Sequence, residues 1–435
     1  MSGEPPPRHA RLDAYLEAHR ERLVSLAEAL VRFPTPCPPG RNAEPVQQFL
    51  DEWLRRLGAE VRRIPLYPGD PQLLARLPGR GGGRALLLNG HVDVAATSPE
   101  EPWETPPFEP ARRHGRLYGR GTADMKGGLA ASLLALEAVL ETCGQLAGDV
   151  VVHCVTGEEM GEAGTQVALA HTPPVDGALV PEPTGGVLAL GQGGVVTGWI
   201  TLRSPETFHD ALRRRMIHAG GGIFGASAIE KMVVVLQALQ ALQALERHWA
   251  VMKSSPGFAP GTTTINPAAI EGGRHPAFVA DRCALWITVH FYPGETVESV
   301  TREIEETVGA AARADPWLRR HPPAFRWGGR SMIEDRGEAF PAFATDPQHP
   351  LARLLVASHI EVHGEPPRVE MLPSVCDAGW IAARGIPAVI YGPGRWEEAH
   401  AVNESVLLRD LEACARVYAR VLSRWCGEGE GGPWA

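Results

Sequence analysis

Residues 85–128 read ALLLNGHVDVAATSPEEPWETPPFEPARRHGRLYGRGTADMKGG, and the rest of the chain is arranged around them. An apolar run over 85–88 stops just before His91 and Asp93, as a buried strand does when it ends at a site. Side chains two apart on a strand point the same way, so His91 and Asp93 share a face. Asp124 follows in a glycine-rich turn that leads into a helical pattern.

Imidazole and carboxylate are ligands that divalent zinc, cobalt and manganese accept. Considered alone, His91 could be a solvated loop histidine and Asp124 could cap a helix. For a single residue, these structural roles are more frequent than metal binding. The two residues together, around one buried strand, favour a metal site.

Further polar residues follow other expected strands. A β-branched run over 149–155 leads into Glu158 and Glu159, a run over 177–180 leads into Glu182, and His400 lies past a run over 388–391. In α/β sheets, ligands gather at the carboxyl ends of strands. Adjacent acids point in different directions, so one can bind a metal while its neighbour faces a water. Acids at a helix N-terminus and a capping histidine remain the structural alternatives.

Composition bounds the class of protein. A chain of 435 residues suggests two domains, and 44% apolar residues is ordinary for a soluble globular protein. The formal charge of −9 argues against nucleic acid as a partner. No apolar run approaches a membrane span and the N-terminus has no signal core, so we expect a cytoplasmic protein with no membrane partner. The seven cysteines are scattered and never form CxxC, which fits reduced thiols.

The order of expected elements changes near residues 191–194. Before this point strands and helices alternate, which predicts an α/β sheet; after it the order is β-α-β-β-α, which predicts a small α+β domain. The α/β pattern then resumes. We therefore expect a two-domain α/β protein, with a first domain from residues 1–194 and 316–435 and an inserted domain over 195–315.

The segments GHVDV, GRGTADMKGG, TGEEMGEAGT, PEPT, GPG and HAVNE occur in this order, and together the chain resembles the M20 family of metallopeptidases and amidohydrolases. The resemblance implies two divalent metal ions, usually zinc and sometimes cobalt or manganese. It implies these roles: His91 as a ligand of one metal, Glu159 and His400 as ligands of the second, Asp124 as the bridge, Glu182 as the remaining carboxylate ligand, the Asp93 carboxylate orienting His91, and Glu158 as general base.

The inserted segment resembles the family's dimerisation domain, which implies a homodimer and an insert that closes over the substrate. His218 resembles a family histidine that reaches the partner's active site and polarises the scissile carbonyl. Asn266 resembles a substrate-binding asparagine, and Gly394 of the GPG segment is expected to bind substrate too. His290 stands where many relatives have an arginine that binds a substrate carboxylate, and it is our third candidate substrate contact.

The function implied is hydrolysis of a linear amide by a water that two metals activate. Our main interpretation is deacylation of a small N-acyl amine or amino acid, as in acetylornithine deacetylase. The alternatives are an N-formyl aminopyrimidine deformylase and a dipeptidase or carboxypeptidase of the same family. From another class, a catalytically inactive ligand-binding homologue also remains open.

Overall fold

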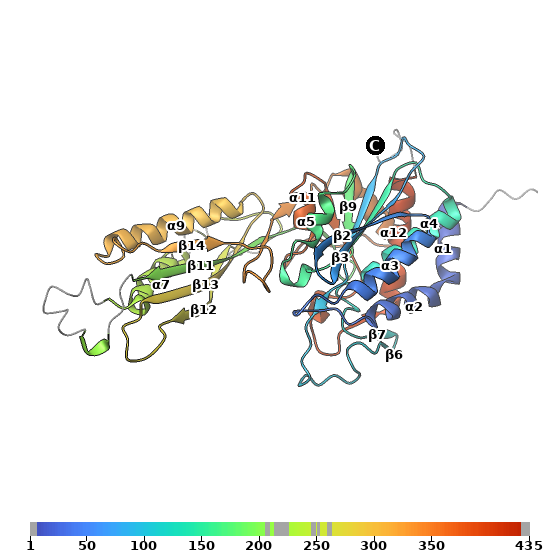
Figure 1. Ribbon diagram of the computed structural model, residues 1–435. Helices are drawn as coiled ribbons and strands as arrows, with labels where there is room; N and C mark the ends of the chain where they lie inside the picture. The colour runs from blue at the N-terminus through green and yellow to red at the C-terminus, as the bar shows by residue number, and fades with distance from the viewer. Residues whose placement is uncertain are drawn as a thin grey trace, which may run out of the picture. The chain divides into compact units, whose positions relative to one another are not determined.

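The computed structural model describes residues 7–204, 209–212, 226–244, 249, 253–258 and 263–427 (Figure 1). The chain divides into two compact units, which we describe separately. The larger unit comprises residues 1–192 and 344–435, and the inserted unit comprises residues 193–343. The expected α/β fold with an inserted α+β unit is confirmed.

A nine-stranded sheet forms the centre of the larger unit, with strand order β16-β10-β18-β9-β4-β8-β3-β2 and β17 paired with β10. Strand β4 is parallel to both β8 and β9, and β9 is parallel to β18, so their carboxyl ends meet at one edge. The strands are β2 Glu60–Tyr67, β3 Asp70–Leu77, β4 Leu86–His91, β8 Val150–Val155, β9 Gly177–Val180, β10 Leu188–Gln192, β16 Phe343–Ala344, β17 Val369–Leu372 and β18 Ala388–Ile390.

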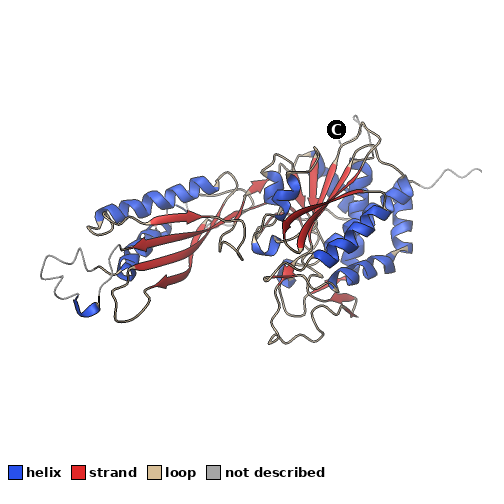
Figure 2. Ribbon diagram, in the orientation of Figure 1, coloured by secondary structure: helices blue, strands red, loops and turns tan. Residues whose placement is uncertain are grey.

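Helices cover this sheet (Figure 2). The central helix, α4 Lys126–Cys143, is rich in Leu and Ala and is buried on nearly all sides against the sheet and α12 Leu408–Trp425. The others are α1 Arg8–Ala18, α2 Arg20–Val31, α3 Glu44–Arg56, α5 Gly164–Leu169, α10 Pro350–His363 and α11 Ala378–Ala382. Small sheets pair β1 Pro36–Cys37 with β5 Val94–Ala95, and β7 Arg116–Tyr118 with β6 Ala111–Arg113 and β19 Ser405–Leu407.

The inserted unit is an antiparallel sheet with helices packed on one face. The strand order is β12-β13-β11-β14, and β15 Ala339–Phe340 also pairs with β11. Helix α9 begins at a capping box in which Thr296 and Ser299 satisfy each other's backbone N–H groups. The remaining elements are β11 Gly194–Arg203, α7 Ala228–Ala244, β12 Thr264–Gly272, β13 Arg282–Phe291, α9 Val297–Ala314 and β14 Ala324–Trp327.

Three details differ from the sequence-based expectation. The insert ends at residue 343 and not at 315, because β14 and β15 pair with β11 in the insert's own sheet. Apolar residues recur at helical spacing over residues 11–32, which predicts one helix, but this stretch forms two helices, α1 and α2, that meet at His19. The sequence predicts a final helix from Ser405 to Trp425, but α12 starts only at Leu408, because residues 405–407 pair with β7. Among the described residues, no helix is long and apolar enough to cross a membrane.

Candidate metal centre

His91 ends strand β4, where the apolar side chains stop at the carboxyl edge of the sheet. Its Nδ1 lies 2.9 Å from the Asp93 carbonyl oxygen, which can only accept, so Nδ1 carries the proton and Nε2 is left free to bind a ligand. The Asp93 carboxylate lies farther off, 3.6 Å from Nδ1, and accepts the Glu159 backbone N–H instead. The Asp93 main chain therefore makes the closest orienting contact with His91.

Asp124 lies in the glycine-rich turn before α4 and faces both histidines. Its Oδ1 is 3.2 Å from His91 Nε2, and its Oδ2 is 3.3 Å from His400 Nε2. The turn is held by Glu404, whose Oε1 accepts the backbone N–H groups of Gly121, Ala123 and Asp124 at 2.8–3.0 Å. One carboxylate of this turn is therefore presented to two separate groups of side chains.

The two glutamates after β8 do point in different directions. They lie in a short 3-10 helix, Glu158–Met160, that begins after Gly157 in the left-handed region. Glu159 Oε2 is 2.8 Å from His400 Nε2, whereas Glu158 Oε2 is 3.9 Å from His91 Nε2. Each glutamate thus faces a different histidine.

Glu182 and His400 complete the arrangement. Glu182 follows β9 and its Oε1 is 3.9 Å from His91 Nε2. His400 comes from the loop after residues 396–398 and has a positive φ of 60°, which turns its ring toward Asp124 and Glu159. Hydrogen bonds to these two carboxylates raise the pKa of His400 to about 10.

Two groups of side chains can each hold a cation. Ligand atoms of His91, Asp124 and Glu182 lie within 4.8 Å of one another, and so do those of Asp124, Glu159 and His400. Asp124 belongs to both groups and offers one oxygen to each. The five residues are the metal ligands that the family resemblance implied, and the distances group Glu182 with His91.

The residues fit two divalent cations on grounds of charge. Asp93 Oδ1, Glu159 Oε1 and Glu182 Oε1 are buried and, within the described part of the chain, have no hydrogen-bond donor. Burial raises the pKa of Glu159 to about 7 and holds those of Glu158 and Glu182 well above their usual range. Buried carboxylates without donors and with raised pKa values form a site that cations stabilise.

A second layer of contacts supports the ligands. Asp377, before α11, makes no helix-capping bond; it accepts a hydrogen bond from Thr165 Oγ1 at 2.7 Å, and burial raises its pKa to about 6. Arg120 donates to Glu404 at 2.7 Å and to the carbonyl oxygens of His400 and Ala401. Sequence reasoning did not find Arg120 or Glu404; their positions inside GRGTADMKGG and HAVNE were the available signal.

The remaining predicted site residues belong to neither ligand group. Gly394 is in the larger unit, with φ 79°, and an added Cβ would lie 2.9 Å from Ala123 Cβ. Asn266 and His290 lie in the inserted unit, on β12 opposite Thr288 and at the end of β13. His218 lies outside the described residues.

Comparison with known proteins decides the family. The model of peptidase family M20/M25/M40 matches residues 87–424, which include every proposed metal ligand. The chain belongs to this family. M20 enzymes are hydrolases, and with the relatives described next this membership makes the chain a hydrolase that acts on an amide bond.

Two relatives are much more similar to this M20 chain than the others described here. N-formyl-4-amino-5-aminomethyl-2-methylpyrimidine deformylase of Halalkalibacterium halodurans is 50% identical over 95% of this chain and 96% of its own. The protein of that name from Bacillus subtilis is 48% identical over 95% and 97%. Acetylornithine deacetylase of Proteus mirabilis is 25% identical over 96% and 98%. The deformylase, our alternative interpretation, is thus better supported than our main interpretation.

Solved M20 structures show the same fold. A tripeptidase from Staphylococcus aureus aligns with a TM-score of 0.68 at 18% identity, over 94% of this chain and 99% of its own. A dinuclear metal-binding M20 peptidase from Bacillus subtilis aligns with a TM-score of 0.65 at 14% identity, over 93% and 98%. At these identities the likeness establishes the fold alone.

Proposed function

We propose that this M20 enzyme removes the formyl group from N-formyl-4-amino-5-aminomethyl-2-methylpyrimidine or a close analogue. The observation that carries the proposal is the identity of 50% and 48% to two deformylases over 95% of the chain. Acetylornithine deacetylase and succinyl-diaminopimelate desuccinylases reach only 25–30% over similar lengths.

His290 supports the same choice. Many relatives are expected to have an arginine at this position that binds a substrate carboxylate. The groups named in a formylated aminopyrimidine include no carboxylic acid, so such an arginine has no anion to bind. Burial lowers the pKa of His290, so a neutral imidazole can hydrogen-bond to a polar heterocycle. Asn266 and Gly394 are proposed as further substrate contacts.

The metal ions are proposed to be two zinc ions, with cobalt or manganese as substitutes. His91 and Glu182 would hold one ion, Glu159 and His400 the other, and Asp124 both. When bound, the ions supply electrophilic charge at the amide carbonyl and lower the pKa of water.

Glu158 is proposed to move the proton. It belongs to neither ligand group, its Oε2 lies 3.9 Å from His91 Nε2, and its raised pKa suits a base that works near neutral pH. A water oxygen attacks the formyl carbon while Glu158 takes the proton. The C–N bond then breaks and Glu158 gives that proton to the leaving amine, which yields formate and the free aminomethyl pyrimidine. His218 is proposed to stabilise the oxyanion from the partner subunit.

We further propose a homodimer that uses the inserted unit. Among the described strands of the inserted unit, β12 lies at an edge of the sheet. Large apolar side chains are exposed on it and on the neighbouring helix α7: Ile270, Val233 and Ile229 are 53%, 49% and 43% exposed. An apolar edge of this kind fits pairing with a second copy. Val233→Lys with Ile270→Lys should give a monomer in analytical ultracentrifugation; a parent chain that is itself monomeric would contradict the proposal.

The test of function is a substrate panel. Metal-loaded protein is given the N-formyl aminopyrimidine, N-acetylornithine, N-succinyl-diaminopimelate and several dipeptides, each with and without a chelator, and release of the amine is measured. We expect chelator-sensitive release from the formyl compound alone. Preferential hydrolysis of N-acetylornithine would restore the deacetylase interpretation. No hydrolysis of any compound, with two metals bound, would favour an inactive binding protein.

A further inference from the structure

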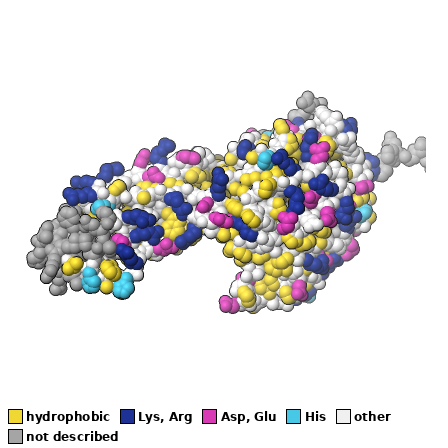
Figure 3. Space-filling view, in the orientation of Figure 1, with side chains coloured by type: hydrophobic (Ala, Val, Ile, Leu, Met, Phe, Trp, Pro, Cys, Tyr) yellow, Lys and Arg dark blue, Asp and Glu magenta, His cyan; other side chains and the backbone are white. Residues whose placement is uncertain are grey.

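One face of the inserted sheet carries no helix in the described part of the unit. Alternate residues of β11 and β13, such as Ile200 and Leu285, enter the core with α7 and α9. The residues between them, including Trp199, Trp286 and Arg282, therefore point to the opposite face. Figure 3 shows several Lys and Arg side chains on the visible face of this unit.

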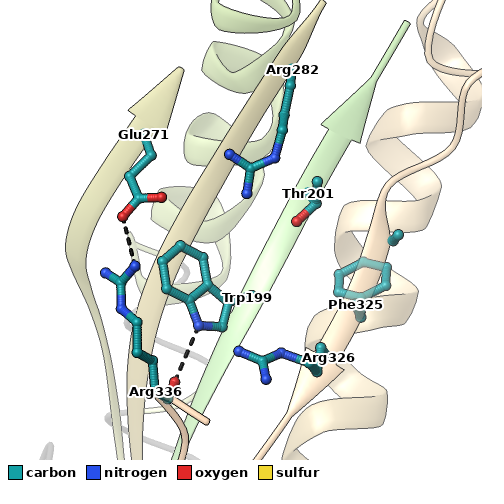
Figure 4. A pocket seen from close by; sticks show the side chains of 8 residues that line it. Trp199, Thr201, Glu271, Arg282, Phe325, Arg326 and Arg336 are labelled. Carbon is teal, nitrogen blue, oxygen red and sulfur yellow. Dashed lines mark hydrogen bonds and ion pairs between the residues drawn. The ribbon is translucent and has the colours of Figure 1, made fainter. Parts of the chain in front are cut away.

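A pocket of about 290 Å³ lies on this face (Figure 4). The indole of Trp199 lies at its centre, and Ala324 of β14, opposite Thr201, adds apolar surface. The guanidinium groups of Arg282, Arg326 and Arg336 surround the indole and come from β13, β14 and the loop before β15. Thr201 and Glu271 complete the lining.

The charges of the lining do not balance. Glu271 is the one acid among the lining residues, and it pairs with Arg336 at 2.8 Å. Among the described residues, the hydrogen bond of Arg326 goes to a neutral acceptor, the Asp335 carbonyl oxygen at 2.8 Å. Arg282 has no ion-pair partner among the described residues. The pocket thus holds two guanidinium charges that no carboxylate of the lining offsets.

The sheet register brings a further positive charge beside Arg282. Arg203 of β11 lies directly opposite Arg282 of β13. Like charges in directly opposed positions destabilise a strand pair, so this arrangement does not serve the fold. An anion bound at Arg282 would relieve the repulsion.

Arg336 is held in place before any ligand binds. It has a positive φ of 50°, a strained conformation for a residue with a side chain. Trp199 Nε1 donates to its carbonyl oxygen at 3.1 Å, and its guanidinium lies 4.5 Å and 5.0 Å from the stacked rings of Trp199 and Trp286. These contacts fix one wall of the pocket, and a fixed wall lowers the entropy lost on binding.

We propose that this pocket binds a phosphate monoester of a small planar or apolar molecule. A phosphate monoester carries nearly two negative charges at neutral pH, which matches the two uncompensated arginines. Guanidinium groups bind phosphate oxygens in a bidentate manner, and the organic part lies against the indole of Trp199. None of these residues belongs to the proposed metal-ligand groups, and the site does not depend on the proposed deformylase activity.

The test measures binding of phenyl phosphate, inorganic phosphate and phenol to metal-loaded full-length protein by calorimetry. Three proteins are compared: the parent chain, Arg282→Ala/Arg326→Ala, and the control Arg302→Ala/Arg320→Ala. The control removes two arginines from the same unit but outside the pocket. The control loses the same net charge as the pocket variant. Phosphate that binds at the metal ions does so in all three proteins, so it does not contribute to the difference between them.

We expect phenyl phosphate to bind the parent and the control more tightly than inorganic phosphate does, and phenol not to bind. The pocket variant should lose at least about tenfold in affinity for phenyl phosphate, since each lost contact involves a charged group. Its rate of amide hydrolysis should be unchanged, which separates this result from failure of the proposed function. Equal binding by all three proteins, or no binding by the parent, would overturn the proposal.

Discussion

Arg120 and Glu404 form a buried ion pair between the two loops that carry metal ligands. Arg120 Nη1 lies 2.7 Å from Glu404 Oε2, and both side chains are almost fully inaccessible to solvent. Glu404 accepts the backbone N–H of Asp124, while Arg120 donates to the carbonyl oxygen of His400. The pair therefore fixes the position of the shared carboxylate relative to the histidine of the second group.

Replacing Glu404 by Gln should weaken both the fold and the second metal site. The variant leaves the Arg120 charge buried and unpaired, which destabilises a protein by about 3–5 kcal/mol. We expect a lower free energy of unfolding in urea and a higher dissociation constant for the second metal, measured by calorimetry. The control is Glu17→Gln, which breaks the surface pair with Arg416 and should change stability by less than about 1 kcal/mol. Unchanged metal affinity in Glu404→Gln would contradict the positioning role.

Glu158 and Glu159 are adjacent, and their amide variants should fail in different ways. Glu158→Gln removes the proposed base but no proposed ligand, so the protein should bind two metals while hydrolysis falls by at least about a hundredfold. Glu159→Gln removes a ligand of the second group, so metal content should drop to about one ion per chain. Metal analysis beside the hydrolysis assay separates the two cases. A fully active Glu158→Gln enzyme would refute the assigned base.

Gly394 should not tolerate a side chain. Its φ is 79°, and an added Cβ would lie 2.9 Å from Ala123 Cβ and 3.0 Å from Ala123 Cα, next to Asp124. Gly58 is a matched control, with φ 86° and no atom within 4 Å of an added Cβ. Both Ala variants bear the backbone strain of about 1–2 kcal/mol, and Gly394→Ala alone should also displace Asp124 and weaken metal binding. Equal metal affinity in the two variants would show that the contact is unimportant.

The sequence predicted those site residues whose position follows from a strand end. His91, Glu159 and Glu182 follow buried strands that are recognisable from their apolar runs, and parallel pairing brings these ends together. Glu404 could not be found this way, because it supports Asp124 from a loop 280 residues farther along the chain. Strand β14 was missed because AFRW has only four residues, too few for its alternation to identify a strand; its pairing with β11 is set by tertiary contacts. The pocket around Arg336 depends on that same pairing.

His153 should make the protein less stable in acid. It lies fully buried on β8, its ring nitrogens contact Asn89 Oδ1 and Thr172 Oγ1, and burial lowers its pKa to about 3. In the unfolded chain its pKa is about 6.5, so between pH 6.5 and 3 the unfolded state binds one more proton than the folded state. Its contribution to stability is complete above pH 6.5 and falls by up to about 1.4 kcal/mol for each pH unit below it.

The variant His153→Gln isolates this effect from the titration of the carboxylates. Gln cannot take up a proton, so the variant is expected to be less stable than the parent at pH 7.5 through lost packing and hydrogen bonds, but to lose less stability on acidification. Urea unfolding of both metal-loaded proteins at pH 7.5 and pH 5 gives the two differences. The parent should lose about 2 kcal/mol more than the variant, because the interval below pH 6.5 spans about one and a half pH units. Equal losses would mean that His153 is already protonated, or is exposed, in the folded protein.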